Sequence, residues 1–376
     1  MKEIRMVDLL GQYSKIKEKL DYAMQDVIEN AVFINGPQVG LFANELADFL
    51  HVKHVIPCAN GTDALQIALM ALDLPRGAEI IVPTFNYVAT AEVIALLGFK
   101  PVFIDSSADN YNLLIGAIEA AITENTRAIM PVHIFGQCVD MLTVLKIAQK
   151  YNLYVIEDAA QAIGSKCFFP DGTERFAGTI GHIGTTSFFP SKNLGCMGDG
   201  GAIFTNDDAF AKKIKAIANH GQSTKYNYDE IGVNSRLDTL QAAILRVKLT
   251  NLSTYNQSRI DAASFYTQFL EAYPFIETPR TAHWTSHVFH QYTLQVDANQ
   301  RDGLKKFLET KNIPTMIYYP LPLHLHKAYQ YLGYKEGDFP NAENISKKVI
   351  SLPMHTELDN EQLLYICNSI IEYFKN

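Results

Sequence analysis

Short apolar segments alternate with segments of helical periodicity along most of the chain. The apolar segments are rich in valine and isoleucine, which is typical of strands that are buried on both faces. Strands that alternate with helices predict a mostly parallel sheet with helices on both sides. The expected strands are residues 79–82, 102–104, 128–132, 153–156, 185–188 and 202–204, and the expected helices among them are 64–72, 90–97 and 142–150.

The pattern changes after Asn234. Residues 237–269 carry helical periodicity with only polar interruptions, and a mixture of strands, helices and proline-rich loops follows. A chain of 376 residues is long enough for two domains. We therefore expect an α/β fold with a large domain at 26–250, built on a mostly parallel mixed sheet, and a smaller α+β domain at 251–376. Residues 1–25 are expected to form an N-terminal arm with one helix.

Composition and charge exclude several classes of protein. Hydrophobic residues make up 48% and charged residues 19% of the chain, which predicts a folded core and not disorder. The formal net charge is -8 and no long run of lysine or arginine occurs, which argues against a nucleic-acid partner. The five cysteines are widely spaced and form no CxxC pair, so neither a disulfide framework nor a thiolate zinc site is expected.

The sequence predicts neither a signal peptide nor a membrane span. The first residues are mixed and polar, unlike a signal peptide, and no uncharged apolar stretch of about 18 residues predicts a membrane span. These features predict a cytoplasmic protein without a membrane partner.

Polar residues of unusual type follow the predicted strands, where ligands bind in open α/β sheets. Lys192 stands in SFFPSKNLGCMGDGG, an apolar segment with several glycines, and glycine lets the backbone approach a ligand closely. A desolvated lysine loses its proton more easily and can bond covalently to a carbonyl compound. A lysine exposed on a surface loop is the alternative, and this segment alone does not decide between the two.

Asp158 follows the predicted strand 153–156, in the segment EDAAQA. Burial of a carboxylate is costly unless it is paired. The pyridine nitrogen of pyridoxal 5'-phosphate (PLP) is a basic partner, and a carboxylate there keeps the ring protonated. Gln161 lies one turn further on, where it can hydrogen-bond the phenolic oxygen of the ring. The alternative for Asp158 is a helix N-cap, a common use of this residue.

Two more segments suit a phosphate and a flat ring. Gly61 and Thr62, in NGTDA, open an apolar helix, and the free N–H groups at a helix N-terminus bind phosphate. Capping by Thr62 or Asp63 explains the same residues equally well. Tyr87, in PTFNY directly after the strand 79–82, can stack on a flat cofactor, although a single aromatic residue is more often part of a core.

In chain order, NGTDA, PTFNYVATAEV, EDAAQA, SFFPSKNLGCMGDGGAIFTND and GVNSRLDTLQAA resemble the sugar aminotransferases of the DegT/StrS type, within the fold type I PLP enzymes. The resemblance runs from about Val7 to His355, and the lysine motif and NSRLD are its most specific parts. It implies a PLP-dependent transaminase that moves an amino group from an amino acid, expected to be glutamate, to a keto-sugar attached to a nucleotide.

The resemblance also implies roles for matching residues. Lys192 would carry the cofactor and transfer the proton, Asp158 would pair with the pyridine nitrogen, and Gln161 with the phenolic oxygen. Tyr87 would stack on the ring. Asn234 would reach the phosphate bound by a neighbouring subunit, so that a homodimer shares its sites. The phosphate ligands within the subunit would be Gly61, Thr62 and Ser187. The residues near the sugar nucleotide would be Arg236, Tyr318, Tyr319 and His324.

SFFPSK followed by GDGGAIFTND resembles relatives that aminate a UDP-linked 3-keto-N-acetylhexosaminuronic acid for bacterial surface polysaccharide, such as the O-antigen of lipopolysaccharide. Relatives that act on dTDP-linked 3-keto-6-deoxyhexoses tend to carry FYPGK. The resemblance thus predicts a uronic acid substrate. One residue departs from this pattern: Tyr318, in MIYYPLPLH, stands where that group often has histidine. A dTDP- or UDP-linked neutral 3- or 4-keto-6-deoxyhexose is the alternative substrate.

Other classes of protein fit less well. A PLP-dependent sugar dehydratase shares the fold but replaces the lysine with histidine, whereas Lys192 is present. A PLP-binding regulator without turnover is the non-enzyme alternative, and the intact set of Lys192, Asp158 and Gln161 argues against it. A nicotinamide enzyme needs GxGxxG after its first strand, which the sequence does not contain. His324 and His326 have no evident third ligand, so no metal site is expected.

Overall fold

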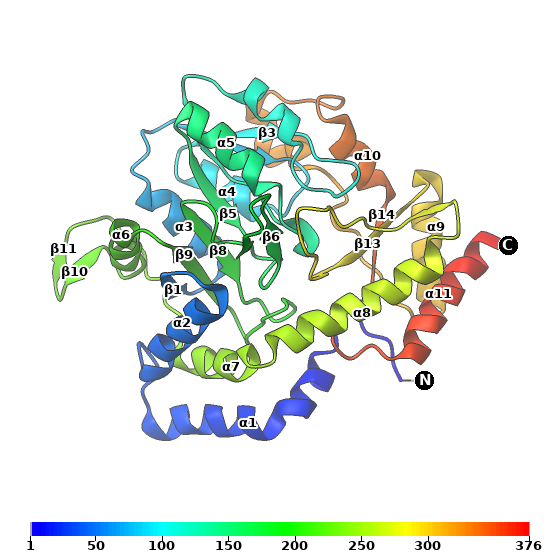
Figure 1. Ribbon diagram of the computed structural model, residues 1–376, viewed down its shortest axis with the longest axis horizontal. Helices are drawn as coiled ribbons and strands as arrows, with labels where there is room; N and C mark the ends of the chain where they lie inside the picture. The colour runs from blue at the N-terminus through cyan, green and yellow to red at the C-terminus, as the bar shows by residue number, and fades with distance from the viewer. Residues whose placement is uncertain (1, 376) are drawn as a thin grey trace.

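The computed structural model describes residues 2–375, so Met1 and Asn376, the ends of the predicted arm and of the predicted C-terminal domain, lie outside the described residues. A seven-stranded sheet lies at the centre of the molecule (Figure 1). Its strands are β1 (His54–Cys58), β2 (Glu79–Pro83), β3 (Lys100–Ile104), β4 (Thr126–Ile129), β5 (Tyr154–Asp158), β8 (Ile183–Ser187) and β9 (Gly201–Thr205).

The strand order in this sheet is β1-β9-β8-β5-β4-β2-β3. Strand β9 runs antiparallel to both of its neighbours, and the other neighbouring strands pair in parallel. Parallel strands need long crossover connections, which are usually helical. The helices in these connections and after β9 are α3 (Gly61–Ala71), α4 (Ala89–Leu96), α5 (Met141–Tyr151) and α6 (Asp208–Ala218). The predicted α/β fold with a mostly parallel mixed sheet is therefore confirmed.

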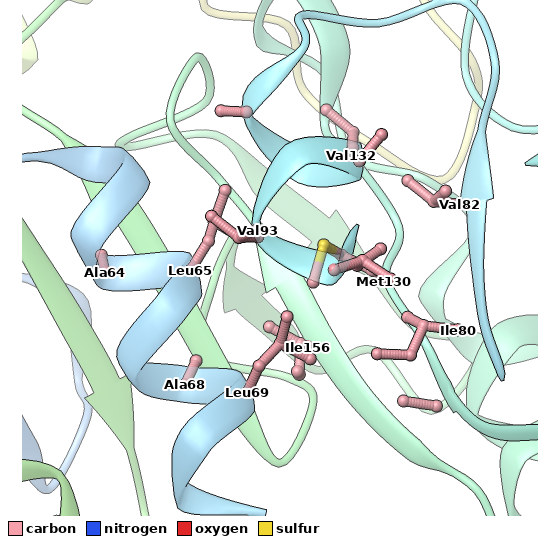
Figure 2. Packing of buried hydrophobic residues seen from close by; sticks show 14 of the residues in the cluster. Ala64, Leu65, Ala68, Leu69, Ile80, Val82, Val93, Met130, Val132 and Ile156 are labelled. Atoms are coloured by element: carbon pink, nitrogen blue, oxygen red, sulfur yellow. The ribbon is translucent and has the colours of Figure 1, made fainter. Parts of the chain in front are cut away.

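Helix α3 is buried deeply because it is apolar almost all round. Asn60 caps its N-terminus, where Asn60 Oδ1 accepts a hydrogen bond from the N–H of Asp63 at 2.8 Å. Leu65 and Leu69 face Ile156 of β5 in the core between helix and sheet (Figure 2). Burial of side chains of this size stabilises the fold by ~1.5–3 kcal/mol each. The N-terminus of α3 is thereby fixed beside the sheet.

Three predicted elements differ from those observed, two of them after β3. The strand expected at 128–132 ends at Ile129, although Val132 still forms a single bridge with Asp158. The helical stretch expected at 237–269 is two helices, α7 (Thr239–Leu249) and α8 (Leu252–Leu270). Between them, the side chains of Thr250 and Asn251 both donate hydrogen bonds to the carbonyl of Val247, at 2.9 and 3.1 Å. Such bonds compete with the helical backbone and end α7.

The N-terminal helix is longer than predicted. Helix α1 (Leu9–Asn30) continues beyond residue 25 and ends at Ala31, which adopts a left-handed conformation with φ 52°. Helix α2 (Pro37–Leu50) follows it, and both helices pack against α7. The predicted boundaries at 25 and 250 stay predictions.

The C-terminal part has a sheet and an apolar core of its own. Strands β12 (Ile276–Glu277), β13 (Tyr292–Val296) and β14 (Val349–Leu352) form an antiparallel sheet. Helices α9 (Ala298–Thr310), α10 (Pro340–Lys348) and α11 (Asn360–Lys375) pack with it, and α8 reaches it from the large sheet (Figure 1). Buried residues of this core include Tyr266, Tyr292, Leu304 and Ile366.

The remaining elements are short. Two hairpins are formed by β6 (Lys166–Phe168) with β7 (Glu174–Phe176) and by β10 (Gln222–Thr224) with β11 (Asn227–Tyr228). The hairpin β10–β11 projects from the molecule beyond α6 (Figure 1). Short 3-10 helices occur at Ile115–Ala117, Glu119–Ala121, Ile134–Gly136, Leu323–Leu325 and Lys327–Leu332. Within residues 2–375, no helix has both the length and the apolar character that a membrane crossing requires.

Candidate active site

The carboxyl ends of the parallel strands bring together three of the segments singled out in the sequence. Asp158 is the last residue of β5, and Lys192 lies in the loop between β8 and β9. The segment that contains Tyr87 follows β2 directly. Because parallel strands end at one edge of the sheet, these segments share the place where open α/β sheets bind ligands.

Lys192 is a partly buried lysine with an altered basicity. The turn that holds it is closed by a hydrogen bond from Lys192 N to the carbonyl of Phe189, at 2.8 Å. Burial lowers the pKa of the Lys192 amine to about 8, and the negative charge of Asp158 opposes this shift. An amine with a pKa near 8 is neutral often enough at physiological pH to act as a nucleophile or a base.

Asp158 is the carboxylate that faces this amine. Its side chain is 7% exposed, and burial raises the pKa of the carboxyl group. The N–H of Ala160, at 3.0 Å from Asp158 Oδ1, and the charge of Lys192 act in the opposite direction. A buried carboxylate with one hydrogen bond within the protein can take up a cationic partner.

Gln161 is positioned by two hydrogen bonds. Its Oε1 accepts a bond from the N–H of Phe135 at 2.7 Å, and its Nε2 donates to the hydroxyl of Tyr319 at 3.1 Å. The second hydrogen of Nε2 remains for another acceptor. The rings of Phe85 and Tyr87 lie 5.8 and 6.4 Å from the ring of Tyr319, between centroids. Tyr87 is itself 57% exposed, so part of its side chain is open to a ligand.

The N-terminus of α3 lies against the end of β8. A Cβ atom on Gly61 would stand 2.6 Å from Cβ of Ser187, so the approach requires glycine at this position. The first N–H groups of a helix have no acceptor within the helix, and the helix dipole favours an anion there. Gly61, Thr62 and Ser187 are thus grouped around a place that suits a phosphate.

The donor set at this edge fits the cofactor that the resemblance implies. PLP carries an aldehyde, a basic ring nitrogen, a phenolic oxygen and a phosphate. The matching groups are the amine of Lys192, the carboxylate of Asp158, the amide of Gln161 and the N-terminus of α3. Each group has a burial and a hydrogen-bond pattern that leaves it able to bind.

Two further expected site residues flank Ser235, whose Oγ accepts a hydrogen bond from the N–H of Ala59, just before the cap of α3, at 3.1 Å. Asn234 is exposed and pairs through its backbone with Asn219. Arg236 donates to Asn219 Oδ1 at 3.2 Å and lines a cavity of about 400 Å³ beside β1, together with Lys215. Lys192 is not among the residues that line this cavity.

His324 is engaged by partners within the protein, and its contact with a substrate stays a prediction. This side chain is 1% exposed, and both ring nitrogens are engaged within the protein. Nδ1 lies 2.8 Å from Thr84 Oγ1, and Nε2 lies 3.2 Å from Glu343 Oε1. A buried histidine with two partners supports the loop and cannot reach a substrate without losing both bonds. Tyr318 and Tyr319, further back in this segment, are partly buried and lie 5.9 Å apart between ring centroids.

Sequence reasoning missed a buried pair behind Asp158. Glu157 accepts hydrogen bonds from His133 Nε2 at 2.8 Å and from the N–H groups of Gly178, Ile180 and Gly181 at 2.9, 2.6 and 2.5 Å. His133 Nδ1 accepts a bond from the N–H of Val139 at 3.1 Å. The network fixes the end of β5 and thereby Asp158. The sequence could have indicated this pair, because His133 directly follows a predicted strand and so, like Asp158, lies at the ligand-binding edge of the sheet.

Comparison with known proteins gives one consistent family. A family model described as the DegT/DnrJ/EryC1/StrS aminotransferase family matches residues 14–371. A pleiotropic regulatory protein of Geobacillus stearothermophilus is 44% identical over 99% of this chain and 99% of its own length. The UDP-2-acetamido-2-deoxy-3-oxo-D-glucuronate aminotransferase of Pseudomonas aeruginosa is 43% identical over 98% of this chain and 99% of its own length. The UDP-N-acetyl-3-dehydro-alpha-D-glucosamine 3-aminotransferase of Acidithiobacillus ferrooxidans is 41% identical, with 98% and 97% covered.

Solved structures agree with this result. DesV from S. venezuelae superposes with a TM-score of 0.95 at 35% identity, and the match covers 100% of both chains. NtdA from Bacillus subtilis, solved with bound cofactor PMP, has a TM-score of 0.88 at 30% identity, with 96% of this chain and 82% of that chain covered. The likeness extends over both the large sheet and the C-terminal part.

Proposed function

Because the chain belongs to the DegT/DnrJ/EryC1/StrS aminotransferase family, we propose that it transfers an amino group from an amino acid, with L-glutamate as the expected donor, to a UDP-linked 3-keto-N-acetylhexosaminuronic acid. It is a PLP-dependent aminotransferase. A sugar nucleotide as acceptor is supported by two relatives above 40% identity, both named for UDP-linked 3-oxo sugars. The observation that carries the catalytic part is the amine of Lys192, held at low basicity opposite Asp158.

In this proposal Lys192 has two tasks. Its amine holds the cofactor covalently between turnovers, and it carries the proton that leaves the α-carbon of the amino donor. A group that accepts and returns a proton works best when its pKa lies near the working pH. Burial brings the pKa of Lys192 to about 8, which suits both steps. PLP, when bound, supplies the electron sink that makes the α-proton acidic.

The other residues orient and stabilise. Asp158 pairs with the ring nitrogen and holds it protonated, while Gln161 donates its remaining amide hydrogen to the phenolic oxygen. The N-terminus of α3, with Thr62 and Ser187, would hold the phosphate, and the ring of Tyr87 would cover one face of the cofactor. The Glu157–His133 pair holds the end of β5, so that the carboxylate of Asp158 does not have to be repositioned during turnover.

Chemical labelling tests the assignment of Lys192. Borohydride reduction of the protein with PLP, followed by peptide mapping, should attach the cofactor to Lys192. Lys248 is an internal comparison, because burial also lowers the pKa of its amine to about 8. A label on Lys248, or no label on either lysine, contradicts the proposal. The Lys192→Ala protein should take up no label.

The acceptor is the second part of the proposal. Support for a uronic acid comes from the relative of Pseudomonas aeruginosa, which is named for a 3-oxo-glucuronate, and from Arg236, whose guanidinium can bind a carboxylate through two hydrogen bonds. Tyr318 adds no positive charge near neutral pH. The relative of Acidithiobacillus ferrooxidans is named for a neutral glucosamine, and it favours the alternative acceptor.

Two substrates that differ only at C-6 separate these acceptors. We expect kcat/KM for the C-6 carboxylate to exceed that for the C-6 hydroxymethyl or methyl sugar by about 100-fold, since loss of the carboxylate leaves the partly buried Arg236 without its partner. The Arg236→Gln protein should lose this preference, whereas Arg280→Gln, on an exposed arginine, should keep it. Equal values in the wild type would move the proposal to a neutral amino sugar.

A homodimer with shared sites is the third part. Large apolar side chains stand exposed on the segment between α1 and α2 and around the hairpin β10–β11, among them Phe33 at 49%, Ile34 at 52%, Tyr226 at 77% and Ile231 at 86%. Phe33 and Ile34 are neighbours in the chain, and exposed apolar residues that adjoin favour a protein interface. A second copy of the chain that covers this surface would bring Asn234 to the other copy's phosphate site.

The biological setting follows from the same family resemblance. We place the reaction in the cytoplasmic synthesis of bacterial surface polysaccharide, such as the O-antigen of lipopolysaccharide. One observation favours a second candidate function, because a relative at 44% identity is named a pleiotropic regulatory protein. A PLP-binding regulator would take up the cofactor on Lys192 and release no keto acid from amino donors. Measurement of keto acid formation together with the labelling experiment separates the two functions.

A further inference from the structure

The loop that carries Lys192 is held by side chains from helix α8. This loop connects β8 and β9, and α8 runs from the large sheet to the C-terminal part (Figure 1). Asn256 and Arg259 are one helical turn apart on α8, so their side chains lie on the same face of the helix. Both are buried, with exposed fractions of 6% and 3%.

Asn256 holds the residue that follows the lysine. Asn256 Oδ1 accepts a hydrogen bond from Asn193 Nδ2 at 2.7 Å, and Asn256 Nδ2 donates to the carbonyl of Ile163 at 3.1 Å. Asn193 Nδ2 also donates to the carbonyl of Val288 at 2.9 Å. Asn193 is therefore tied both to α8 and to the segment that leads into β13.

Arg259 holds the residue that precedes the lysine. Its guanidinium donates to the carbonyl of Ser191 at 3.5 Å, and to the carbonyls of Phe289, His290 and Met354 at 3.3, 3.3 and 3.0 Å. Every one of these acceptors is a backbone carbonyl. Burial alone lowers the pKa of Arg259 to about 10. A buried guanidinium is expensive to keep, and here its donors join the lysine loop to the C-terminal part.

We propose that Asn256 and Arg259 are positioning residues, which fix the main chain on both sides of Lys192 and hold its amine in the dehydrated place from which it acts. This inference rests on the proposed function, in which Lys192 is the reacting group. Without these two side chains, the flanks of Lys192 lose their anchors on α8, and water gains access to the amine. The position of α8 would in this way affect the pKa of the Lys192 amine.

The charged and titratable groups around the amine set the direction of the expected change. Asp158 faces Lys192 from the end of β5, and its charge raises the pKa of the amine. His290 faces it from the segment before β13, and burial keeps this imidazole neutral by lowering its pKa well below the usual value. Arg259 donates to the carbonyls of both Ser191 and His290, and its positive charge also lowers the pKa of the His290 imidazole. Burial therefore dominates, and hydration of the loop must raise the pKa of Lys192.

The test is a titration of lysine reactivity in the full chain without cofactor. The protein is pulsed with an amine-reactive anhydride over a range of pH, and peptide mapping reads the extent of modification at Lys192. The wild-type midpoint should lie near 8. In Asn256→Ala and Arg259→Met the midpoint should rise by about one unit or more towards that of a hydrated lysine. In the same variants kcat should fall more than the KM for the amino donor changes.

Three comparisons separate positioning from plain destabilisation. Tyr266→Phe removes a buried hydrogen bond of 3.0 Å from the same helix to the carbonyl of Pro353, and it should lower stability without moving the midpoint of Lys192. Arg259→Lys keeps the charge but loses the forked donors, so it should restore the midpoint only in part. Lys327, an exposed lysine outside this loop, serves as reference in Asn256→Ala, where its own midpoint should not move.

An unchanged midpoint of Lys192 in a folded Asn256→Ala protein overturns the inference, even if Arg259→Met does not fold. If Arg259→Lys restored the wild-type midpoint of Lys192 fully, the positive charge at residue 259 would suffice without the forked donors. That result would also contradict the positioning role. Because the titration needs no cofactor, its result is independent of the borohydride experiment. Failure of PLP to label Lys192 in the wild type would count against the proposed function and leave the titration intact.

Discussion

At the scale of single residues, burial shifts the pKa values of Lys192 and Asp158 in opposite directions. It lowers the pKa of Lys192 to about 8 and raises the pKa of Asp158, so it makes the neutral form of each more accessible. Their mutual attraction opposes both shifts. A cationic cofactor ring between them would replace the lysine as partner of Asp158 and leave the lysine free to exchange protons.

The first prediction concerns Asp158. Asp158→Asn should still bind PLP, because the lysine and the phosphate site are unchanged, but kcat should fall by about 100-fold or more. An amide is neutral and does not hold the ring nitrogen protonated. Turnover and the absorbance of the bound cofactor measure the two effects separately. Asp171→Asn, in an exposed turn, is the control and should behave as wild type. Turnover within a few-fold of wild type in Asp158→Asn means that Asp158 does not have this role.

At the scale of elements, the site depends on the contact between α3 and β8. The N-terminus of a helix binds phosphate only if its N–H groups are held where the phosphate arrives. Here the helix is fixed by its buried apolar faces, and Gly61 allows it to approach Ser187. The glycine is needed for space and not for an unusual backbone conformation.

The second prediction follows from this contact. In Gly61→Ala, the added methyl would meet Ser187 Cβ at 2.6 Å, so α3 has to move away from β8. We expect the dissociation constant for PLP to rise by about 10-fold or more and the free energy of unfolding to fall by about 1–3 kcal/mol. Cofactor titration and urea unfolding measure these changes. Gly116→Ala adds the same methyl group where no atom lies within 4 Å, and it should leave cofactor binding unchanged. Equal affinity in both variants contradicts the phosphate assignment.

At the scale of the whole molecule, the proposed homodimer would complete the site with residues from two chains. Lys192 and Asp158 lie at the carboxyl edge of the large sheet, while Asn234 is exposed and Arg236 lines a cavity beside β1. Residues that lie apart in one chain can meet at the interface of a symmetric dimer, where the same surface of each copy takes part.

The third prediction tests shared sites by complementation. Lys192→Ala and Asn234→Ala chains should each be impaired alone. In a heterodimer, one site regains both residues, since its lysine comes from one chain and its asparagine from the other. Random mixing should restore about one quarter of wild-type activity, because half of the dimers are mixed and each has one complete site. Heterodimers verified by mass that remain as inactive as the parents would rule out sharing of Asn234 between subunits.

Buried histidines link the whole fold to pH. Burial lowers the pKa of His287 to about 3 and that of His355 to about 4, and it lowers the pKa of His290 well below the usual value. Below pH 6.5 the unfolded chain binds protons at these residues and the folded chain does not. Proton uptake by the unfolded chain then favours unfolding, so stability is present above pH 6.5 and is lost as the pH falls towards the folded values.

The fourth prediction gives this effect a size. Each such histidine should lower the free energy of unfolding by about 1.4 kcal/mol per pH unit below 6.5, as long as it stays neutral in the fold. His355→Gln should flatten the dependence between neutral and mildly acidic pH by that amount in urea unfolding. His326→Gln, on an exposed histidine, should leave the slope as it is. A slope that His355→Gln does not change would show that His355 is protonated in the folded protein.

Much of the fold could be predicted from the sequence because local signals and the global arrangement agree. The strands β2, β5 and β9 and the helices α3, α4 and α5 lie where apolar periodicity placed them, since each buries the face that its pattern marks. The break at residues 250–251 escaped the pattern, because it arises from two side-chain hydrogen bonds to one carbonyl. Hydrophobic periodicity carries no record of such bonds.

The sequence by itself determined the family and the chemistry: the order of motifs around Lys192 and Asp158 belongs to a PLP-dependent aminotransferase. The tertiary structure decided which polar residues face the site and which support it. His324 reads in the sequence as a substrate contact, and the fold buries it between Thr84 and Glu343. Asn256 lies far from Lys192 in the chain, and the packing of α8 brings it to the lysine loop. Long-range contacts of this kind depend on how elements pack, and packing leaves no local pattern in the chain.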